Sequence, residues 1–273
     1  MQKLVLLGLF ILVACSTTPL KQDGLDQGNK LIEISDLYSA GHEQLQTVLM
    51  TDHALGKMLD SNLAATLLIT LTIEYEDGEK ERIQQSGSFI LNGEYILTAG
   101  HGFYVDSGKL IDLEAQTISR QKLALNVVAL KNSRDNYSKQ DWAILQPVNP
   151  RRTKSLEVAP VGYSGEDAYI LGYPGGMGLN DSSRVVHALE VDEGAVYPLV
   201  VICERSLTRP GIITPKVGAI PVQGMSGAPV LSEEGRLIGL FSSISRTRNI
   251  AGWHYIFHMS DIPFETLDSL SIN

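Results

Sequence analysis

The chain has 273 residues, of which 44% are hydrophobic, and it contains 25 glycines and 11 prolines. This composition is that of a globular protein with one large domain or two ordinary ones. The formal net charge of −9, with no cluster of Lys and Arg to offset it, argues against nucleic acid or an anionic membrane surface as the main partner.

The first fifteen residues are typical of a secretory targeting segment. Lys3 supplies a positive charge, and residues 4–14 form an apolar run of eleven residues. This run is too short to span a bilayer as a helix, but it has the length of the hydrophobic region of a signal peptide. It ends Leu-Val-Ala-Cys at Cys15, which resembles the lipobox of bacterial lipoproteins. The resemblance implies a lipid on the Cys15 thiol and a signal peptide over 1–15; an ordinary secretory signal is the alternative.

Residues 16–62 are expected to form a tether followed by a short helical segment. Ser16 follows the cysteine, and by resemblance to Gram-negative lipoproteins this favours delivery to the outer membrane, on its periplasmic face. Up to about residue 30 the sequence is polar and lacks periodicity, as a flexible tether does. Apolar residues recur at helical spacing over 44–60, which predicts one or two short helices. They either pack outside the folded domain or belong to a pro-segment.

Cys15 and Cys203 are the only cysteines in the chain. After lipidation one thiol remains, so no disulfide can form within the chain and the exported domain must rest on its hydrophobic core. Cys203 ends an apolar run over 198–203, and we expect it to be a buried core thiol rather than a reactive one.

From residue 64 onward the pattern predicts an all-β domain. Residues 66–76 alternate apolar and polar side chains after an apolar start, and the Asp-Gly at 77–78 and the Asn-Gly at 92–93 are typical hairpin turns. Many short strands without amphipathic helices between them favour barrels or sandwiches. The further strands are expected at 87–91, 95–98, 123–130, 142–146, 167–172, 184–191, 197–203, 228–231, 236–243 and 253–258.

Three short motifs contain the parts of an acyl-transfer site in the order His, Asp, Ser. Thr-Ala-Gly-His ends at His101, Asp-Trp-Ala-Ile-Leu begins at Asp141, and Gly-Met-Ser-Gly-Ala-Pro-Val contains Ser226. A serine hydroxyl is a poor nucleophile at neutral pH, so it needs a base to take its proton and an acceptor that holds the tautomer of that base. An α/β-hydrolase would need a G-x-S-x-G motif and the order Ser, Asp, His, and the chain has neither.

These motifs resemble those of the trypsin-like (chymotrypsin-fold) serine proteases, in particular the disulfide-free bacterial branch that includes the HtrA-type enzymes. The resemblance covers about 64–262. It implies two six-stranded antiparallel β-barrels, with His101 and Asp141 in the first, Ser226 in the second and the active site in the cleft between them. The peptidase domain is then expected at 63–273, with barrels at about 63–150 and 151–262, a C-terminal helix at 262–270 and no PDZ domain.

The same resemblance assigns further residues to the site. The backbone N–H groups of Gly224 and Ser226 would form the oxyanion hole, each donor worth ~3 kcal/mol in the barrier. Ser242 falls where the family has a serine that reaches the aspartate, and a buried carboxylate needs such donors to stay charged. Its hydroxyl is therefore expected to reach Asp141; a strand serine facing solvent is the alternative.

Two positions are expected to shape the specificity pocket, and one excludes a known route of activation. Ile220 and Ile244 fall at pocket positions of the family, and an apolar base argues against a preference for Lys or Arg and favours small or medium apolar residues. Met225 stands where the digestive branch has the aspartate that pairs with a new N-terminus after zymogen cleavage. Activation by that ion pair is therefore not expected.

The sequence thus predicts a membrane-anchored envelope serine endopeptidase that cleaves protein or peptide substrates through an acyl-enzyme intermediate. Two alternatives stay open: a catalytically silent trypsin-fold lipoprotein that binds peptides or proteins, and hydrolysis of a non-peptide ester by the same site. No cofactor or metal is expected, because the remaining histidines lack metal-ligand spacing with a carboxylate. The histidines expected to be surface or packing residues are His42, His53, His187, His254 and His258.

Overall fold

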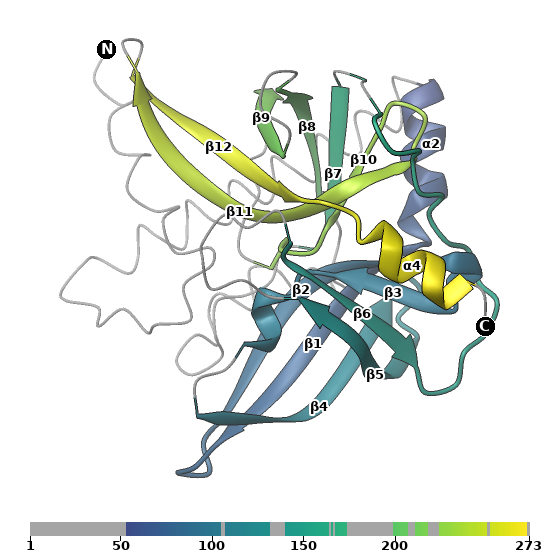
Figure 1. Ribbon diagram of the computed structural model, residues 1–273, viewed down its shortest axis with the longest axis vertical. Coiled ribbons are helices and arrows are strands. Elements are labelled where there is room, and N and C mark those ends of the chain that lie inside the picture. The colour runs from purple at the N-terminus through teal and green to yellow at the C-terminus, as the bar shows by residue number, and fades with distance from the viewer. Residues whose placement is uncertain are drawn as a thin grey trace.

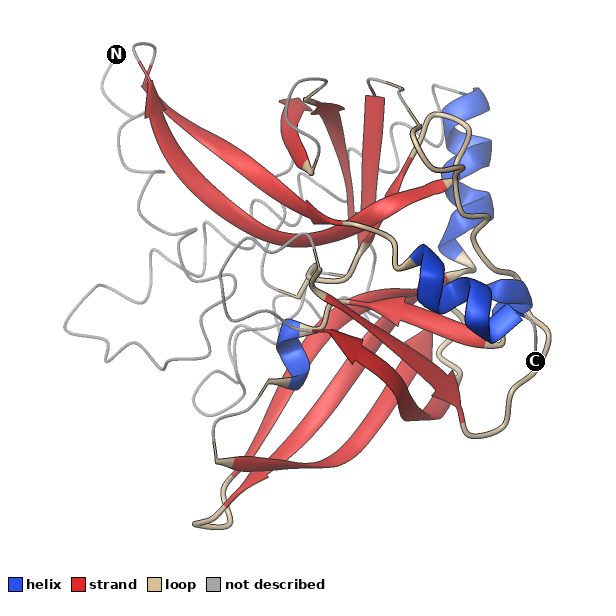
Figure 2. Cartoon of the chain, viewed as in Figure 1, coloured by secondary structure: helices blue, strands red, loops and turns tan. Residues whose placement is uncertain are grey.

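In the computed structural model the chain forms two β-barrels, one above the other in the view of Figure 1. The structure describes residues 53–104, 107–131, 140–163, 165, 167–173, 199–206, 211–217, 224–249 and 252–271. Strands make up most of these residues, and the α-helices among them lie outside the barrels (Figure 2). The prediction of two six-stranded antiparallel barrels is confirmed.

The first barrel is closed by six antiparallel strands in the order β1-β2-β3-β6-β5-β4. The β2–β3 hairpin turns through the predicted Asn-Gly pair, in which Asn92 and Gly93 both have positive φ, 60° and 83°. This hairpin leads directly to the candidate base, because β3 ends three residues before His101. The strands are β1 (Thr66–Tyr75), β2 (Lys80–Ile90), β3 (Tyr95–Thr98), β4 (Gly108–Thr117), β5 (Lys122–Lys131) and β6 (Trp142–Pro147), with short 3₁₀ turns η1 (Leu91–Gly93) and η2 (His101–Phe103).

The second barrel has the strand order β10-β11-β12-β9-β8-β7. Its core contains Cys203, a buried and free thiol as the sequence predicted, and burial raises the pKa of this thiol to about 12. A thiol that stays protonated at neutral pH is a packing group, not a nucleophile. The strands are β7 (Asp167–Gly172), β8 (Leu199–Arg205), β9 (Ile212–Val217), β10 (Pro229–Leu231), β11 (Leu237–Asn249) and β12 (Gly252–Ser260).

Two of the described helices pack against the barrels from outside. Helix α2 (His53–Leu63) buries Leu59 completely, and Asn62 at its end donates to the carbonyl of Gly235, in the turn before β11, at 3.1 Å. Helix α4 (Phe264–Ser271) follows β12 and buries Leu267. Part of the helical segment predicted over 44–60 is thus α2, and residues 44–52 lie outside the described residues. Among the described helices, none has the length and apolarity needed to cross a membrane.

Two strands, β4 and β9, were not predicted from the sequence. The first half of β4 is exposed and carries charged residues on both sides, so it lacks the alternation of a half-buried strand. Strand β9 contains a proline and a lysine, and it pairs with β12 at Ile212 and Ile213. Strands β11 and β12 are longer than predicted, and the strand expected at 184–191 lies outside the described residues.

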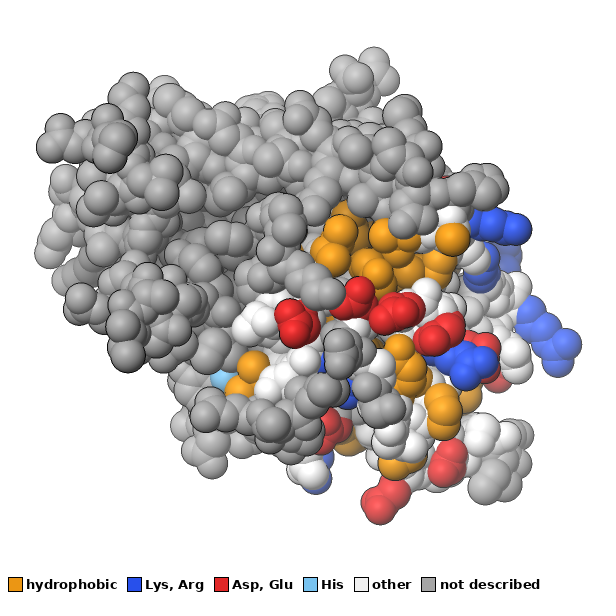
Figure 3. Space-filling model, turned by 90° about the horizontal axis from the view of Figure 1, so that it is seen from above, with side chains coloured by type: hydrophobic (Ala, Val, Ile, Leu, Met, Phe, Trp, Pro, Cys, Tyr) orange, Lys and Arg blue, Asp and Glu red, His pale blue; other side chains and the backbone are white. Residues whose placement is uncertain are grey.

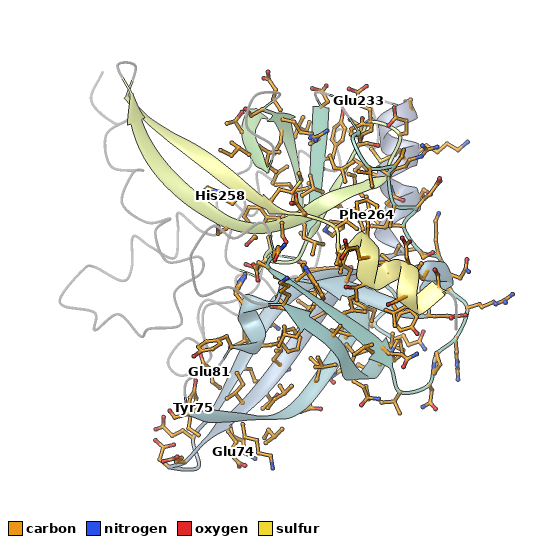
Figure 4. All side chains as sticks on the ribbon, viewed as in Figure 1. Glu74, Tyr75, Glu81, Glu233, His258 and Phe264 are labelled. Atoms are coloured by element: carbon orange, nitrogen blue, oxygen red, sulfur yellow. The ribbon has the colours of Figure 1, made fainter. Side chains whose placement is uncertain are left out.

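The described surface mixes charges and apolar side chains. Figure 3 shows acidic side chains next to hydrophobic ones, with Lys and Arg side chains mostly toward the right of the face seen from above. At the far end of the first barrel, Tyr75 and Glu81 face each other across the β1–β2 hairpin (Figure 4), and the Tyr75 hydroxyl donates to the Glu81 carboxylate. Burial and this contact raise the pKa of Tyr75 to about 12, so the phenol of Tyr75 is neutral at neutral pH.

Candidate active site

His101 lies in a short turn, and hydrogen bonds from β2 hold the residues just before it in place. Gln85 on β2 donates from Nε2 to Thr98 Oγ1 at 2.9 Å and to the carbonyl of Ala99 at 3.2 Å. Gly102 leaves the space that the Gln85 amide fills, because a Cβ there would lie 2.1 Å from Gln85 Oε1. The backbone that carries His101 is therefore tied to the strand beneath it without a disulfide.

Asp141 contacts His101 twice. Its Oδ1 accepts from the backbone N–H of His101 at 2.7 Å, and its Oδ2 lies 2.7 Å from His101 Nδ1. Asp141 is 5% exposed, and it comes together with the histidine because β6, which begins at the next residue, pairs with β3. Burial would raise the pKa of Asp141, but the hydrogen bonds and charge of His101 and a hydrogen bond from Ser242 together hold it below its usual value.

Ser242 is the donor that the sequence predicted for Asp141. Its Oγ donates to Asp141 Oδ2 at 2.5 Å. Strands β11 and β12 change register between Phe241 and Ser243, so Ser242 is the extra residue of a β-bulge. A bulge changes the direction in which the extra side chain points. Here it directs the hydroxyl of Ser242, in the second barrel, toward the carboxylate of Asp141, in the first barrel.

Ser260 also holds Asp141, and sequence reasoning missed it. The backbone N–H of Asp141 donates to Ser260 Oγ at 3.0 Å, and Ser260 is fully buried at the end of β12. The only signal in the sequence is a small polar residue that ends a largely apolar strand. The second barrel thus reaches Asp141 through two serines from neighbouring strands.

Ser226 lies in a tight turn before β10, next to the same group of residues. Its Oγ donates to the carbonyl of Ser242 at 3.3 Å, and its own carbonyl accepts from the N–H of Ser86 at 2.8 Å. Ser226 is 6% exposed. The glycines on either side have positive φ, 93° at Gly224 and 81° at Gly227, a conformation that side chains with a Cβ rarely adopt.

The remaining predicted residues are only partly described. Ile220 and Cys15 lie outside the described residues, and of Ile244 only the backbone, paired with Phe257 in β11–β12, is described. The pocket and the lipid therefore stay predictions. Met225 is fully buried in the core of the second barrel.

Outside the Asp141–His101 pair, the described histidine and acidic side chains do not gather into a second site. His258 on β12 (Figure 4) is partly buried, and burial lowers its pKa, which fits the packing role expected for it. Within the described ranges, no group of three or more His, Cys, Asp and Glu side chains lies close enough to hold a metal ion.

Comparison with known proteins gives a match to a family model and a likeness to a solved structure. A family model described as "Trypsin-like peptidase domain" matches residues 85–240, more than half of the chain. The range contains His101, Asp141 and Ser226 and ends two residues before Ser242. Among solved structures, the chain is similar to the Rv3671c protease from M. tuberculosis in its active form, with 16% identity, a TM-score of 0.49, and coverage of 78% of this chain and 82% of that one. No curated protein matches the chain at a significant level.

Proposed function

The chain belongs to the trypsin-like peptidase family, and from this premise we propose that it is a serine endopeptidase that uses Ser226, His101 and Asp141 as its catalytic triad. The observation that carries the proposal is the double contact between His101 and Asp141. Such a contact orients a histidine as a general base. The G-x-S-G sequence at 224–227, which is followed by a proline and an apolar strand, supplies Ser226 as the proposed nucleophile.

The protonation states follow from this contact. Asp141 has a lowered pKa and is ionised at neutral pH, so it can only accept hydrogen bonds. The Nδ1 of His101 must therefore carry the ring proton, which leaves the lone pair on Nε2 to take the proton of the Ser226 hydroxyl. The negative charge of Asp141 then stabilises the imidazolium that forms.

Peptide cleavage proceeds in two steps. Ser226 Oγ attacks the scissile carbonyl carbon, and the tetrahedral intermediate collapses when the imidazolium of His101 protonates the leaving amine. Water, activated by the neutral His101, then hydrolyses the acyl-enzyme and restores Ser226. The backbone N–H groups of Gly224 and Ser226 would stabilise the oxyanion in both steps, by ~3 kcal/mol for each donor.

The proposed setting of this activity is the bacterial cell envelope. A lipid on Cys15 would anchor the protein to the periplasmic face of the outer membrane, and the polar tether from residue 16 to about residue 30 would hold the barrels away from the lipid surface. The substrates are then proteins or peptides of the envelope. The lipobox and the signal-like apolar run before it support this location.

Active-site labelling tests the chemistry directly. A fluorophosphonate probe should modify wild-type protein at Ser226, and His101→Ala should slow labelling by orders of magnitude although the serine is still present. Ser226→Ala should lose both the label and the hydrolysis of an unfolded protein substrate. Wild-type protein that takes no label would contradict the triad. Label with ester hydrolysis but no peptide cleavage would replace the endopeptidase with an esterase.

A further inference from the structure

Ser86 links the first barrel to the turn that carries Ser226. It lies on β2 and is fully buried. Its backbone N–H donates to the carbonyl of Ser226 at 2.8 Å, and its carbonyl accepts from Thr98 Oγ1 at 2.6 Å. Ser86 thus stands between the strand that leads to His101 and the turn that holds the proposed nucleophile.

The hydroxyl of Ser86 makes further contacts, all with the second barrel. Its Oγ accepts from the backbone N–H of Tyr173 at 2.8 Å. Its single proton can then go to the carbonyl of Gly224 at 3.1 Å, with the carbonyl of Tyr173 at 3.3 Å as a second acceptor. These contacts use the donor and an acceptor site of the buried hydroxyl, and they hold it against the second barrel.

The contact with Gly224 falls on the peptide group between the two proposed oxyanion donors. The 224–225 peptide group consists of the carbonyl of Gly224 and the N–H of Met225. It lies between the two peptide groups that carry the N–H groups of Gly224 and Ser226. The next peptide group is already held, because the carbonyl of Met225 accepts from the N–H of Ala228 at 2.9 Å. Gly224, at φ 93°, has no Cβ to limit its rotation, so its orientation needs an outside contact.

We propose that the Ser86 hydroxyl is a positioning group that holds the 224–225 peptide group in the orientation that forms the oxyanion hole. This inference rests on the proposed serine endopeptidase function. The link between the barrels does not depend on the hydroxyl, because the backbone N–H of Ser86 still bonds Ser226 when the side chain is truncated. Loss of the hydroxyl should therefore affect stabilisation of the transition state more than substrate binding or folding.

Ser88 provides a matched control on the same strand. It is also fully buried in β2, but its Oγ has no hydrogen-bond partner among the described residues. In the full-length protein, Ser86→Ala should lower kcat about tenfold with KM changed less than about twofold, because the hydrogen bond that positions the 224–225 peptide group is lost. Ser88→Ala should leave both constants within about twofold of wild type.

A transition-state analogue separates positioning from a general loss of structure. A peptide boronic acid that forms a tetrahedral adduct with Ser226 should bind Ser86→Ala about tenfold more weakly, whereas a non-covalent peptide product should bind equally well. The acid limb of the pH profile of kcat/KM should not move, because Ser86 does not contact His101 or Asp141. All rates are referred to active sites counted by burst titration, so unfolded protein does not contribute.

A second variant keeps the test decisive if Ser86→Ala folds poorly. Ser86→Cys retains a side chain of similar shape with a weaker donor and should give a kcat between those of wild type and the alanine variant. Equal kcat values and equal boronic acid affinities for Ser86→Ala and Ser88→Ala, with an active wild type, would overturn this inference alone. A wild type without label or turnover would overturn the proposed function and this inference together.

Discussion

The hydroxyl of Ser242 donates a 2.5 Å hydrogen bond to Oδ2 of Asp141, the same carboxylate oxygen that lies 2.7 Å from His101 Nδ1. Asp141 belongs to the first barrel and Ser242 to the second. The orientation of the carboxylate, and through it that of the imidazole, therefore depends on how the two barrels pack.

Replacing Ser242 by alanine should slow catalysis without unfolding the barrels. The change removes one donor from a buried carboxylate, and we expect kcat to fall about tenfold, because a hydrogen bond to a charged group is worth more than one to a neutral group. Steady-state kinetics and the thermal unfolding midpoint measure the two effects. Ser243→Ala is the control, since the adjacent hydroxyl is buried without a hydrogen-bond partner in the described structure. An unchanged kcat in Ser242→Ala would contradict the prediction.

The charge of Asp141 should contribute to stability at neutral pH but not in acid. Its folded pKa lies below its ordinary value of 3.8, so the folded state binds fewer protons than the unfolded state. This contribution is present above the ordinary pKa and is lost as the pH falls through the lowered one. Asp141→Asn should therefore lower the unfolding midpoint more at about pH 7 than at about pH 3. Asp268→Asn, at an exposed position on α4, controls for loss of a carboxylate; equal effects of Asp141→Asn at both pH values would contradict the prediction.

Gly227 should be the least replaceable glycine beside Ser226. Its φ is 81°, and a Cβ there would lie 2.4 Å from the carbonyl oxygen of Ser86 and from Thr98 Oγ1. Gly78, in the β1–β2 turn, has nearly the same φ of 84° but nothing within 4 Å of such a Cβ. Gly78→Ala should cost ~1 kcal/mol from backbone strain alone, whereas Gly227→Ala should cost ~3 kcal/mol or more and remove activity. Denaturant unfolding measures the free energy of unfolding of both variants. Equal losses of this free energy would contradict the prediction, because they would show that the backbone of Ser86 can move to make room for the Cβ.

The lipid anchor can be tested independently of the chemistry. Cells grown with labelled palmitate should tag the wild-type protein, and Cys15→Ala should lose the tag and leave the membrane fraction. Cys203→Ala should remain tagged, because that thiol is buried in the second barrel. A soluble, untagged wild-type protein would remove the lipoprotein proposal and leave the catalytic one unaffected.

Much of the site could be predicted from the sequence because its parts are local. His101 and Ser226 lie in short motifs beside strands with clear apolar patterns, and the Asn-Gly turn at 92–93 sets a hairpin by the backbone preferences of those two residues. Cys203 is buried because its strand is apolar. Ser242 came from resemblance to the family, and the contact with Asp141 is present in the structure.

Only the tertiary structure revealed what Ser260 and Ser86 do. Ser260 meets the backbone of Asp141 across 119 positions of sequence, and Ser86 meets the carbonyl of Gly224 across 138. A serine in a strand has the same local pattern whether its hydroxyl faces a core, a carboxylate or solvent. Its partner depends on strand register, on the bulge at Ser242 and on the packing of one barrel against the other. The sequence by itself therefore determined which groups carry the proposed chemistry, and the fold decided which groups hold them in position, because such contacts are made between strands that are distant in the chain.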